Sequence, residues 1–146
     1  MKLALLVSTL LISTVSLSAA QSGSSVTFVG HDKVSALVAA NGGALASGSD
    51  FAVSIARRTA AGQVEVHEKE TDTFYVLDGS ATFVTGGTMV GGKVSRANQQ
   101  VGTDITGGET HQLTKGDVIT IPAGVPHWFK EVQQPFTYYM VKIVKP

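Results

Sequence analysis

Two acidic and two imidazole side chains stand at spacings that could bring them around one metal ion. Glu65 and His67 are two residues apart, and residues with that spacing on a β-strand point to the same face. Asp72 opens the next predicted strand, so a tight connection would place its carboxylate beside this pair. His127 follows a turn rich in Pro and Gly much further along the chain. Two imidazoles and two carboxylates that converge in one concave space would suit a divalent transition metal.

The charges around His67 also have a simpler interpretation, which is an ordinary solvated surface. His67 would then be a surface residue within a charged face formed by Glu65, Glu68, Lys69, Glu70 and Asp72. Each of these residues, taken alone, favours this interpretation over a metal site. Their spacing by itself leaves both interpretations open.

The elements that must position these residues are predicted to be short β-strands. Residues 51–58 alternate in character, with Phe51, Val53 and Ile55 on one face. The pair Asp78-Gly79 predicts a tight hairpin between two strands. Further runs rich in β-branched and aromatic residues occupy 63–67, 73–77, 81–85, 88–90, 112–113, 118–121, 127–132 and 136–144. Many short strands with closely spaced turns indicate an all-β barrel or sandwich.

Two segments depart from this β pattern. Val34, Leu37 and Val38 repeat at helical spacing within residues 31–40, and Asn and Gly at 41–43 predict the end of one short helix. Residues 86–109 are rich in Gly and polar side chains. We expect a loose hairpin at the edge of the barrel there, and a mobile flap over a pocket is the alternative, because long loops in compact domains are often functional.

The first twenty residues are predicted to be a secretory signal peptide. Lys2 supplies a positive charge, residues 3–17 form a short apolar run, and small residues at 18–20 offer a cleavage site. A membrane-spanning helix needs about 20 apolar residues, which is more than this run provides. We therefore expect a secreted or periplasmic protein with no membrane attachment after cleavage. Residues 21–146 are predicted to form a single domain.

The composition excludes several classes of function. Without Lys2 the chain has ten basic and eleven acidic side chains, so neither nucleic acid nor an anionic membrane is an expected partner. The absence of Cys excludes thiolate metal sites and Cys nucleophiles. No serine lies in a G-x-S-x-G motif, and the sequence contains no phosphate-binding glycine loop followed by Lys and a hydroxyl residue.

Residues 65–79 resemble the first sequence motif of the cupin family. This segment reads EVHEKETDTFYVLDG. His67 falls on the second histidine of the motif, Asp72 on its acidic residue and Gly79 on its glycine. The motif pairs two histidines one residue apart with an acidic residue and a glycine downstream.

Residues 116–131, which read GDVITIPAGVPHWFKE, resemble the second cupin motif. Gly116, Pro122, Gly124 and His127 stand in the expected register, and 36 residues separate the two segments. The resemblance implies an all-β double-stranded β-helix, or jelly-roll, barrel. The short helix at 31–40 would precede this barrel.

The resemblance also implies one divalent metal ion bound by Glu65, His67, Asp72 and His127. The chain departs from the family pattern at three positions. Glu65 replaces a histidine, Asp72 replaces a glutamate, and Glu131 stands where asparagine is usual. Two carboxylates among four ligands favour a harder ion such as Mn or Fe(II), with Zn also possible.

Other side chains are predicted to lie around this ion. Strand alternation places Phe74, Val76 and Phe129 on the same faces as the ligands, so we expect an apolar pocket wall, and ordinary core packing is the alternative. Glu131 is a candidate base beyond the ligands. Arg57 could bind an anion inside the barrel, although we favour its emergence at the end of a strand. Which of the two tyrosines at 138 and 139 faces inward stays open.

The function that these features favour is a metalloenzyme of the oxygenase, isomerase or lyase type acting on a small organic molecule. Such chemistry needs open positions on the ion, and four protein ligands on a six-coordinate ion would leave two. A non-catalytic barrel that binds a small molecule or carbohydrate is the alternative, and a barrel with a vestigial site is a third possibility. A homodimer is expected by analogy with the cupin family.

Overall fold

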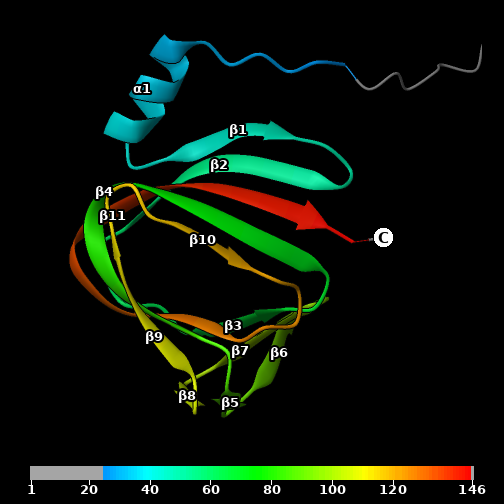
Figure 1. Ribbon diagram of the computed structural model, residues 1–146. Helices are drawn as coiled ribbons and strands as arrows, with labels where there is room; N and C mark the ends of the chain where they lie inside the picture. The colour runs from blue at the N-terminus through cyan, green and yellow to red at the C-terminus, as the bar shows by residue number, and fades with distance from the viewer. Residues whose placement is uncertain (1–24, 146) are drawn as a thin grey trace, which may run out of the picture.

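The structure is a computed structural model, and it describes residues 25–145. The predicted signal peptide at residues 1–20 lies outside this described part. The predicted helix is confirmed as α1 (His31–Ala39), and the chain leaves it through Asn41 and Gly42, two residues with positive φ. It lies beyond β1 at one end of the molecule (Figure 1). No helix within residues 25–145 is both long and apolar enough to cross a membrane.

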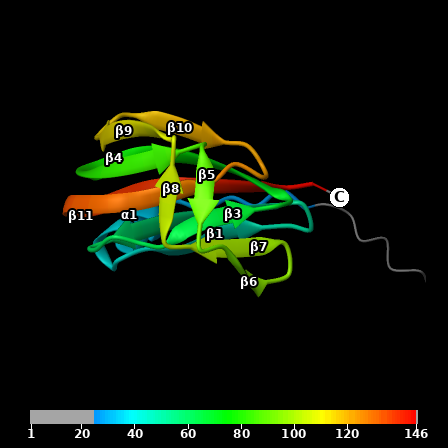
Figure 2. The ribbon, with the colours of Figure 1, turned by 90° about the horizontal axis from the view of Figure 1, so that it is seen from below.

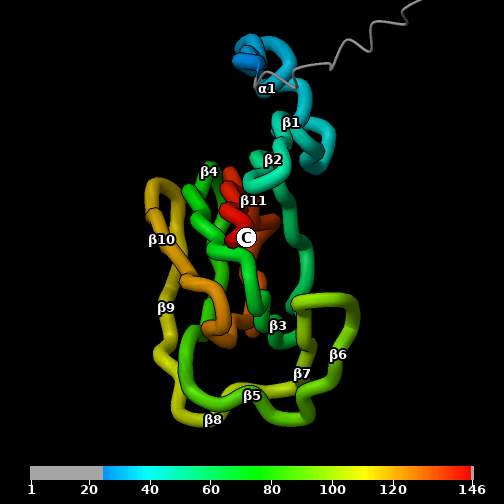
Figure 3. Tube along the Cα trace, turned by 90° about the vertical axis from the view of Figure 1, so that its right-hand side faces the viewer, coloured from blue at the N-terminus to red at the C-terminus, as the bar shows by residue number. Residues whose placement is uncertain are grey.

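The rest of the described chain is β-structure, which confirms the predicted all-β class. The strands wrap into an open jelly-roll barrel, seen from the side in Figure 3. Their bounds are β1 (Gly43–Ser47), β2 (Phe51–Arg58), β3 (Val64–His67), β4 (Glu70–Thr85), β5 (Thr88–Val90), β6 (Lys93–Arg96), β7 (Gln99–Gly102), β8 (Asp104–Thr106), β9 (Glu109–Thr114), β10 (Val118–Ile121) and β11 (His127–Val144).

Two long antiparallel strands, β4 and β11, hold the barrel together. They pair with one another along nearly their whole length. The first half of β4 also pairs with β10 and its second half with β9. The second half of β11 pairs with β2, and its first residue pairs with β3. Segments far apart in the sequence therefore meet along these two strands.

A cluster of aromatic rings fills the barrel between these strands. Phe74 and Phe83 project from β4, and Phe129, Phe136 and Tyr138 project from β11, all of them buried. The centroids of the Phe83 and Phe129 rings are 4.5 Å apart, and those of Phe74 and Tyr138 are 4.8 Å apart. Burial of each such side chain stabilises the fold by roughly 1.5–3 kcal/mol.

The predicted hairpin at Asp78-Gly79 is wrong, because β4 continues through these residues without reversing direction. The segments on either side of Gly79 both pair with β11, so the chain cannot reverse there. Gly79 has φ +83° and faces the Pro135 carbonyl, and the pairing shifts register at this point. The glycine does adopt the positive φ typical of a hairpin turn, but here this conformation makes a bend within one strand.

Residues 86–109, expected to be a loose hairpin at the edge of the barrel, form the four short strands β5 to β8, of which β6 and β7 pair as a hairpin at the edge of the main sheet. Strands β5 and β8 pair with each other and run across one end of the barrel (Figure 2). Strand β7 pairs with both β6 and β3. The segment therefore extends the main sheet next to the strand that carries Glu65 and His67.

Substitution of Gly79 should reveal how strongly this bend is constrained. Gly79→Ala would place a Cβ against the Pro135 carbonyl in a positive-φ conformation, so we expect a loss of at least about 2 kcal/mol in the free energy of unfolding. Gly116→Ala is the matched control, because φ is +95° there but no atom lies within 4 Å of the new Cβ. Its loss should be about 1 kcal/mol in denaturant titrations. Equal losses would contradict the role assigned to the contact with Pro135.

Candidate metal centre

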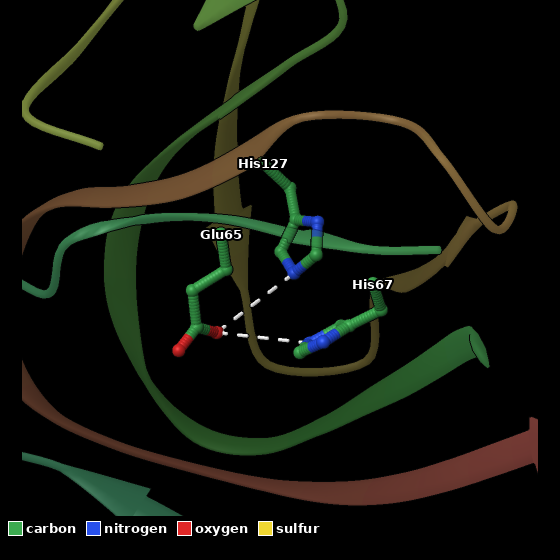
Figure 4. Close-up of side chains that lie close together, drawn as sticks. All are labelled: Glu65, His67 and His127. Atoms are coloured by element: carbon green, nitrogen blue, oxygen red, sulfur yellow. Dashed lines mark ion pairs between the residues drawn. The ribbon is translucent and has the colours of Figure 1, made fainter. Parts of the chain in front are cut away.

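Strand register brings Glu65, His67 and His127 together on the inner face of the barrel. His127, the first residue of β11, pairs directly with Glu65 of β3, and His67 follows Glu65 by two residues on the same strand face. Oε2 of Glu65 lies 3.8 Å from Nε2 of His67 and 4.0 Å from Nε2 of His127 (Figure 4). One ligand atom from each residue lies within 4.8 Å of the other two.

The separations among these atoms are close to those required around a metal ion. Ligand atoms bonded at about 2.1 Å at tetrahedral or octahedral angles lie roughly 3.0–3.4 Å apart. The side chains need to move by less than about 1 Å to reach that spacing. Both imidazoles are buried, at 5% exposure for His67 and 4% for His127, so the group is not the solvated surface that the sequence left open.

The ring of His127 is oriented by the turn that precedes it. Nδ1 of His127 lies 3.1 Å from the carbonyl oxygen of Val125. A carbonyl only accepts hydrogen bonds, so Nδ1 carries the proton and the lone pair of Nε2 points toward Glu65. The backbone N–H of Gly124 also donates to the carbonyl of His67 at 2.8 Å, which ties this turn to β3. The turn thus fixes both the tautomer and the position of a ligand nitrogen.

His67 has an unsatisfied nitrogen, which is rare in a buried side chain. Its Nδ1 has no hydrogen-bond partner within the described residues and lies 3.6 Å from Oε2 of Glu70. In the tautomer with the proton on Nδ1, the N–H faces that carboxylate. The lone pair of Nε2 is then directed toward Glu65. An imidazole backed by a carboxylate is typical of metal-binding histidines.

Both imidazoles are held in the neutral form that metal ligation requires. Burial lowers the pKa of His67, and the nearby Lys142 lowers it further, while Asp72 opposes the shift. Burial also lowers the pKa of His127, although its hydrogen bond to Val125 opposes this. The donor set therefore presents two neutral nitrogens and one carboxylate at neutral pH.

Asp72 is buried beside His67, but it is bound to a lysine that the sequence analysis missed. Nζ of Lys142 donates to both carboxylate oxygens of Asp72, at 2.7 and 2.9 Å, and to Oε2 of Glu70 at 2.9 Å. Oδ2 of Asp72 is 3.6 Å from Nε2 of His67. Lys142 pairs directly with Asp72 in the register of β11 and β4. Its charge lowers the pKa of Glu70, against the effect of burial, which raises it.

Two further polar residues lie near these ligands, and both come from the segment expected to be a loose hairpin. Nε2 of Gln99 on β7 donates to Oε1 of Glu65 at 3.4 Å, which leaves Oε2 facing the histidines. Arg96 lies 3.5 Å from Glu70. Neither residue carries a sequence signal, because both lie within the Gly-rich segment 86–109.

A cavity of about 370 Å³ adjoins the three candidate ligands. Phe74, Phe129 and Tyr138 line it, whereas Val76, which the sequence analysis also placed in the pocket wall, is fully buried in the core. Arg58 also lines the cavity, with its guanidinium carbon 4.4 Å from the centroid of the Phe129 ring. The neighbouring Arg57 also lines the cavity, but its side chain is exposed.

The structure does not bring Glu131 to this group. Its side chain is exposed and accepts a hydrogen bond from Oγ1 of Thr82 at 3.3 Å, outside the residues that line the cavity. The outward position follows from a register shift in β11 between Phe129 and Glu131.

Comparisons with known proteins agree with the fold described above. A family model described as Cupin matches residues 18–145. A search of curated protein sequences finds no match. Each solved structure below is less than 25% identical, which shows a shared fold alone.

Three similar structures come from yeast and bacteria. The cupin domain of Cnp3 from Schizosaccharomyces pombe aligns with a TM-score of 0.51 and 15% identity, over 71% of this chain and 64% of that one. KdgF from Halomonas sp. aligns with a TM-score of 0.51 and 16% identity, over 72% of this chain and 80% of that one. BH2720 from Bacillus halodurans aligns with a TM-score of 0.50 and 17% identity, over 70% and 69%. This chain therefore spans just under two thirds of the Cnp3 domain.

A double-mutant cycle should measure the interaction between Asp72 and Lys142. Lys142→Met leaves the buried carboxylate of Asp72 without its partner, and Asp72→Asn leaves the half-buried Lys142 with Glu70 alone. Each variant should lower the free energy of unfolding by about 3 kcal/mol. The double variant should lose at least about 1 kcal/mol less than the sum of the two. Lys145→Met, an exposed control, should change stability by less than about 0.5 kcal/mol in the same denaturant titrations. Simple additivity of the two losses would contradict the pairing.

The stability of the chelator-treated protein should fall as the pH drops from about 7 to about 5. The ordinary histidine pKa is 6.5, and both buried rings have lower values in the folded state. The unfolded chain therefore takes up protons first, so this stability is present above pH 6.5 and is lost below it. Thermal melts of His67→Gln should show a weaker pH dependence, whereas exposed His31→Gln should match the wild type. An unchanged slope in His67→Gln would contradict the assignment.

Proposed function

Because this chain belongs to the cupin family, we propose that it binds one divalent metal ion through Glu65, His67 and His127. The adjoining cavity would hold a small organic molecule on which the protein acts. The observation that carries this proposal is the convergence of two neutral, buried imidazoles and one carboxylate within 4.8 Å. Asp72, which the sequence analysis placed among the ligands, would instead stay bound to Lys142.

The ligand set restricts the choice of ion. Two histidines and one carboxylate with open positions are typical of non-haem Fe(II) sites, and Mn and Zn also accept these donors. The bound ion would supply Lewis-acid chemistry and, if it is iron, redox chemistry with O2. These options correspond to the isomerase, lyase and oxygenase classes.

The residues around the cavity would bind and orient the organic molecule. Phe74 and Phe129 form an apolar wall that excludes water from one side. The hydroxyl of Tyr138 keeps its proton at neutral pH, because burial raises its pKa despite the opposing charge of Arg58. It would therefore act as a hydrogen-bond donor to the bound molecule. Lys142 would hold Asp72 and Glu70 in place beside His67.

A non-catalytic binding barrel is the second candidate function. The observation that favours it is the ion pairing of Asp72 and Glu70 with Lys142, which engages two of the three carboxylates near the site without any metal. Steady turnover of a metabolite by the metal-loaded protein would exclude this second function.

Export and dimer formation are also part of the proposal. Export rests on the sequence pattern of residues 1–20, and the N-terminal residue of the mature protein tests it.

A homodimer is supported by exposed apolar side chains on the outer face of neighbouring strands: Tyr75, Val118 and Ile143 are 46%, 65% and 50% exposed. Sedimentation equilibrium tests the dimer, and a monomer at micromolar concentration would remove it from the proposal.

Metal analysis of dialysed variants tests the ligand set. We expect about one ion per wild-type chain, and affinity at least about 100-fold lower in Glu65→Ala and His127→Ala, because each loses a direct ligand. Asp72→Asn should lower the metal affinity about tenfold or less, since Asp72 contacts His67 but is not itself a ligand in this proposal. His111→Ala is the control, because that ring contacts Thr85 and does not line the cavity.

Equal losses of metal affinity in Asp72→Asn and Glu65→Ala, measured by mass spectrometry and calorimetric titration, would show that Asp72 is a direct ligand. Full occupancy in His127→Ala would contradict the proposed site altogether. A wild-type chain that binds none of Mn, Fe(II) or Zn would do the same.

A further inference from the structure

Arg58 is a half-buried cation of the cavity that has no acidic partner among the described residues, and its neighbour Arg57, which also lines the cavity, is exposed. Lys142 pairs with Asp72 and Glu70, and Arg96 lies beside Glu70. Within residues 25–145, Arg58 forms no ion pair. Its contacts are with the face of the Phe129 ring and with the hydroxyl of Tyr138, to which Nε donates at 3.3 Å. A half-buried guanidinium with only neutral neighbours is a favourable site for an anion.

The surroundings of Arg58 fix its direction and leave donors available. Arg58 ends β2 opposite Phe136 of β11, and strand alternation directs it to the same side as Ala56, which also lines the cavity. The guanidinium lies over Phe129, two residues from His127. The hydrogen bond to Tyr138 is its only side-chain hydrogen bond within the described residues, and it uses Nε. Both Nη groups therefore remain for a ligand.

The balance of charge in the cavity also favours an anionic ligand. The negative charges of Glu70 and Asp72 are offset by the positive charges of Lys142 and Arg96. Of the charged residues that line the cavity, Glu65, Arg57 and Arg58 are then left, and a divalent ion on Glu65 would add two positive charges. The cavity would carry an excess of positive charge that an anionic small molecule can offset.

We propose that the cavity takes a small organic carboxylate whose carboxylate group pairs with the guanidinium of Arg58. The planar fork of an arginine matches the two oxygens of a carboxylate. The body of the molecule lies against Phe74 and Phe129, and its other end reaches the group formed by Glu65, His67 and His127. This inference rests on the proposed function for the metal end, whereas the contact with Arg58 needs no metal.

Calorimetric titration with benzoate, and with benzamide as its neutral counterpart, tests the carboxylate contact. Both probes are titrated into metal-free and Mn-loaded full-length protein. Benzoate should bind at least about tenfold more tightly than benzamide, and Arg58→Gln should weaken benzoate at least about tenfold while leaving benzamide within about twofold. Lys115→Gln is the control, because this exposed cation does not line the cavity, and it should leave both affinities unchanged.

Several results would overturn the inference. These are equal affinities for benzoate and benzamide, benzoate binding that is unchanged in Arg58→Gln, and Arg58-dependent binding of inorganic phosphate that is tighter than that of benzoate. If Arg58→Gln fails to fold, Arg58→Lys replaces it. The lysine keeps the charge but loses the fork, so benzoate should still weaken by about threefold or more if both carboxylate oxygens are bound.

The two proposals can fail separately. Arg58-dependent binding of benzoate to a chain that takes up no metal would support the carboxylate site and refute the metal site. A chain that binds metal through Glu65 and His127 but shows no effect of Arg58 on benzoate would refute the carboxylate site alone.

Discussion

The pairing of β11 with β3 and β4 is the constraint on which the rest of this structure depends. His127 at the start of β11 lies opposite Glu65, and Lys142 near its end lies opposite Asp72. A slip of one residue in an antiparallel pair would turn every side chain of a strand to the opposite face. The metal group and the ion pair are thus both consequences of a single register, which the aromatic rings of the core hold in place.

Irregularities in these two strands allow both of their halves to face the cavity. On β11 the inward residues are Phe129 in the first half and Phe136 and Tyr138 in the second, so the alternation changes phase between them. On β4 the same change occurs at Gly79, because Phe74 is inward before it and Phe83 after it. Bulges and a glycine with positive φ are the usual means by which a strand makes such a change.

The sequence was sufficient to predict the fold class and three of the residues that meet. Glu65 and His67 follow from the two-residue period of a strand, and His127 follows from its place after a turn of prolines and glycine. Lys142 and the outward position of Glu131 could not be predicted by alternation, because the phase changes within β11 are not visible in the residue types. Arg58 was missed for a related reason: apolar residues occupy both faces of β2, so the pattern did not indicate that Arg58 lines the cavity.

The site divides into two halves that share His67. On one side, Glu65 and His127 present a carboxylate and a lone pair, and on the other, Asp72 and Glu70 are paired with Lys142, with Arg96 beside Glu70. Because charges interact strongly where water is excluded, the lysine keeps two acidic groups compatible with burial. Anomalous diffraction from crystals grown with Mn or Zn would test this division most directly. The account predicts one ion bonded to Glu65, His67 and His127 at about 2.0–2.2 Å, with Asp72 still against Lys142. An ion bound by Asp72 in place of Glu65, or an ion outside the cavity, would contradict it.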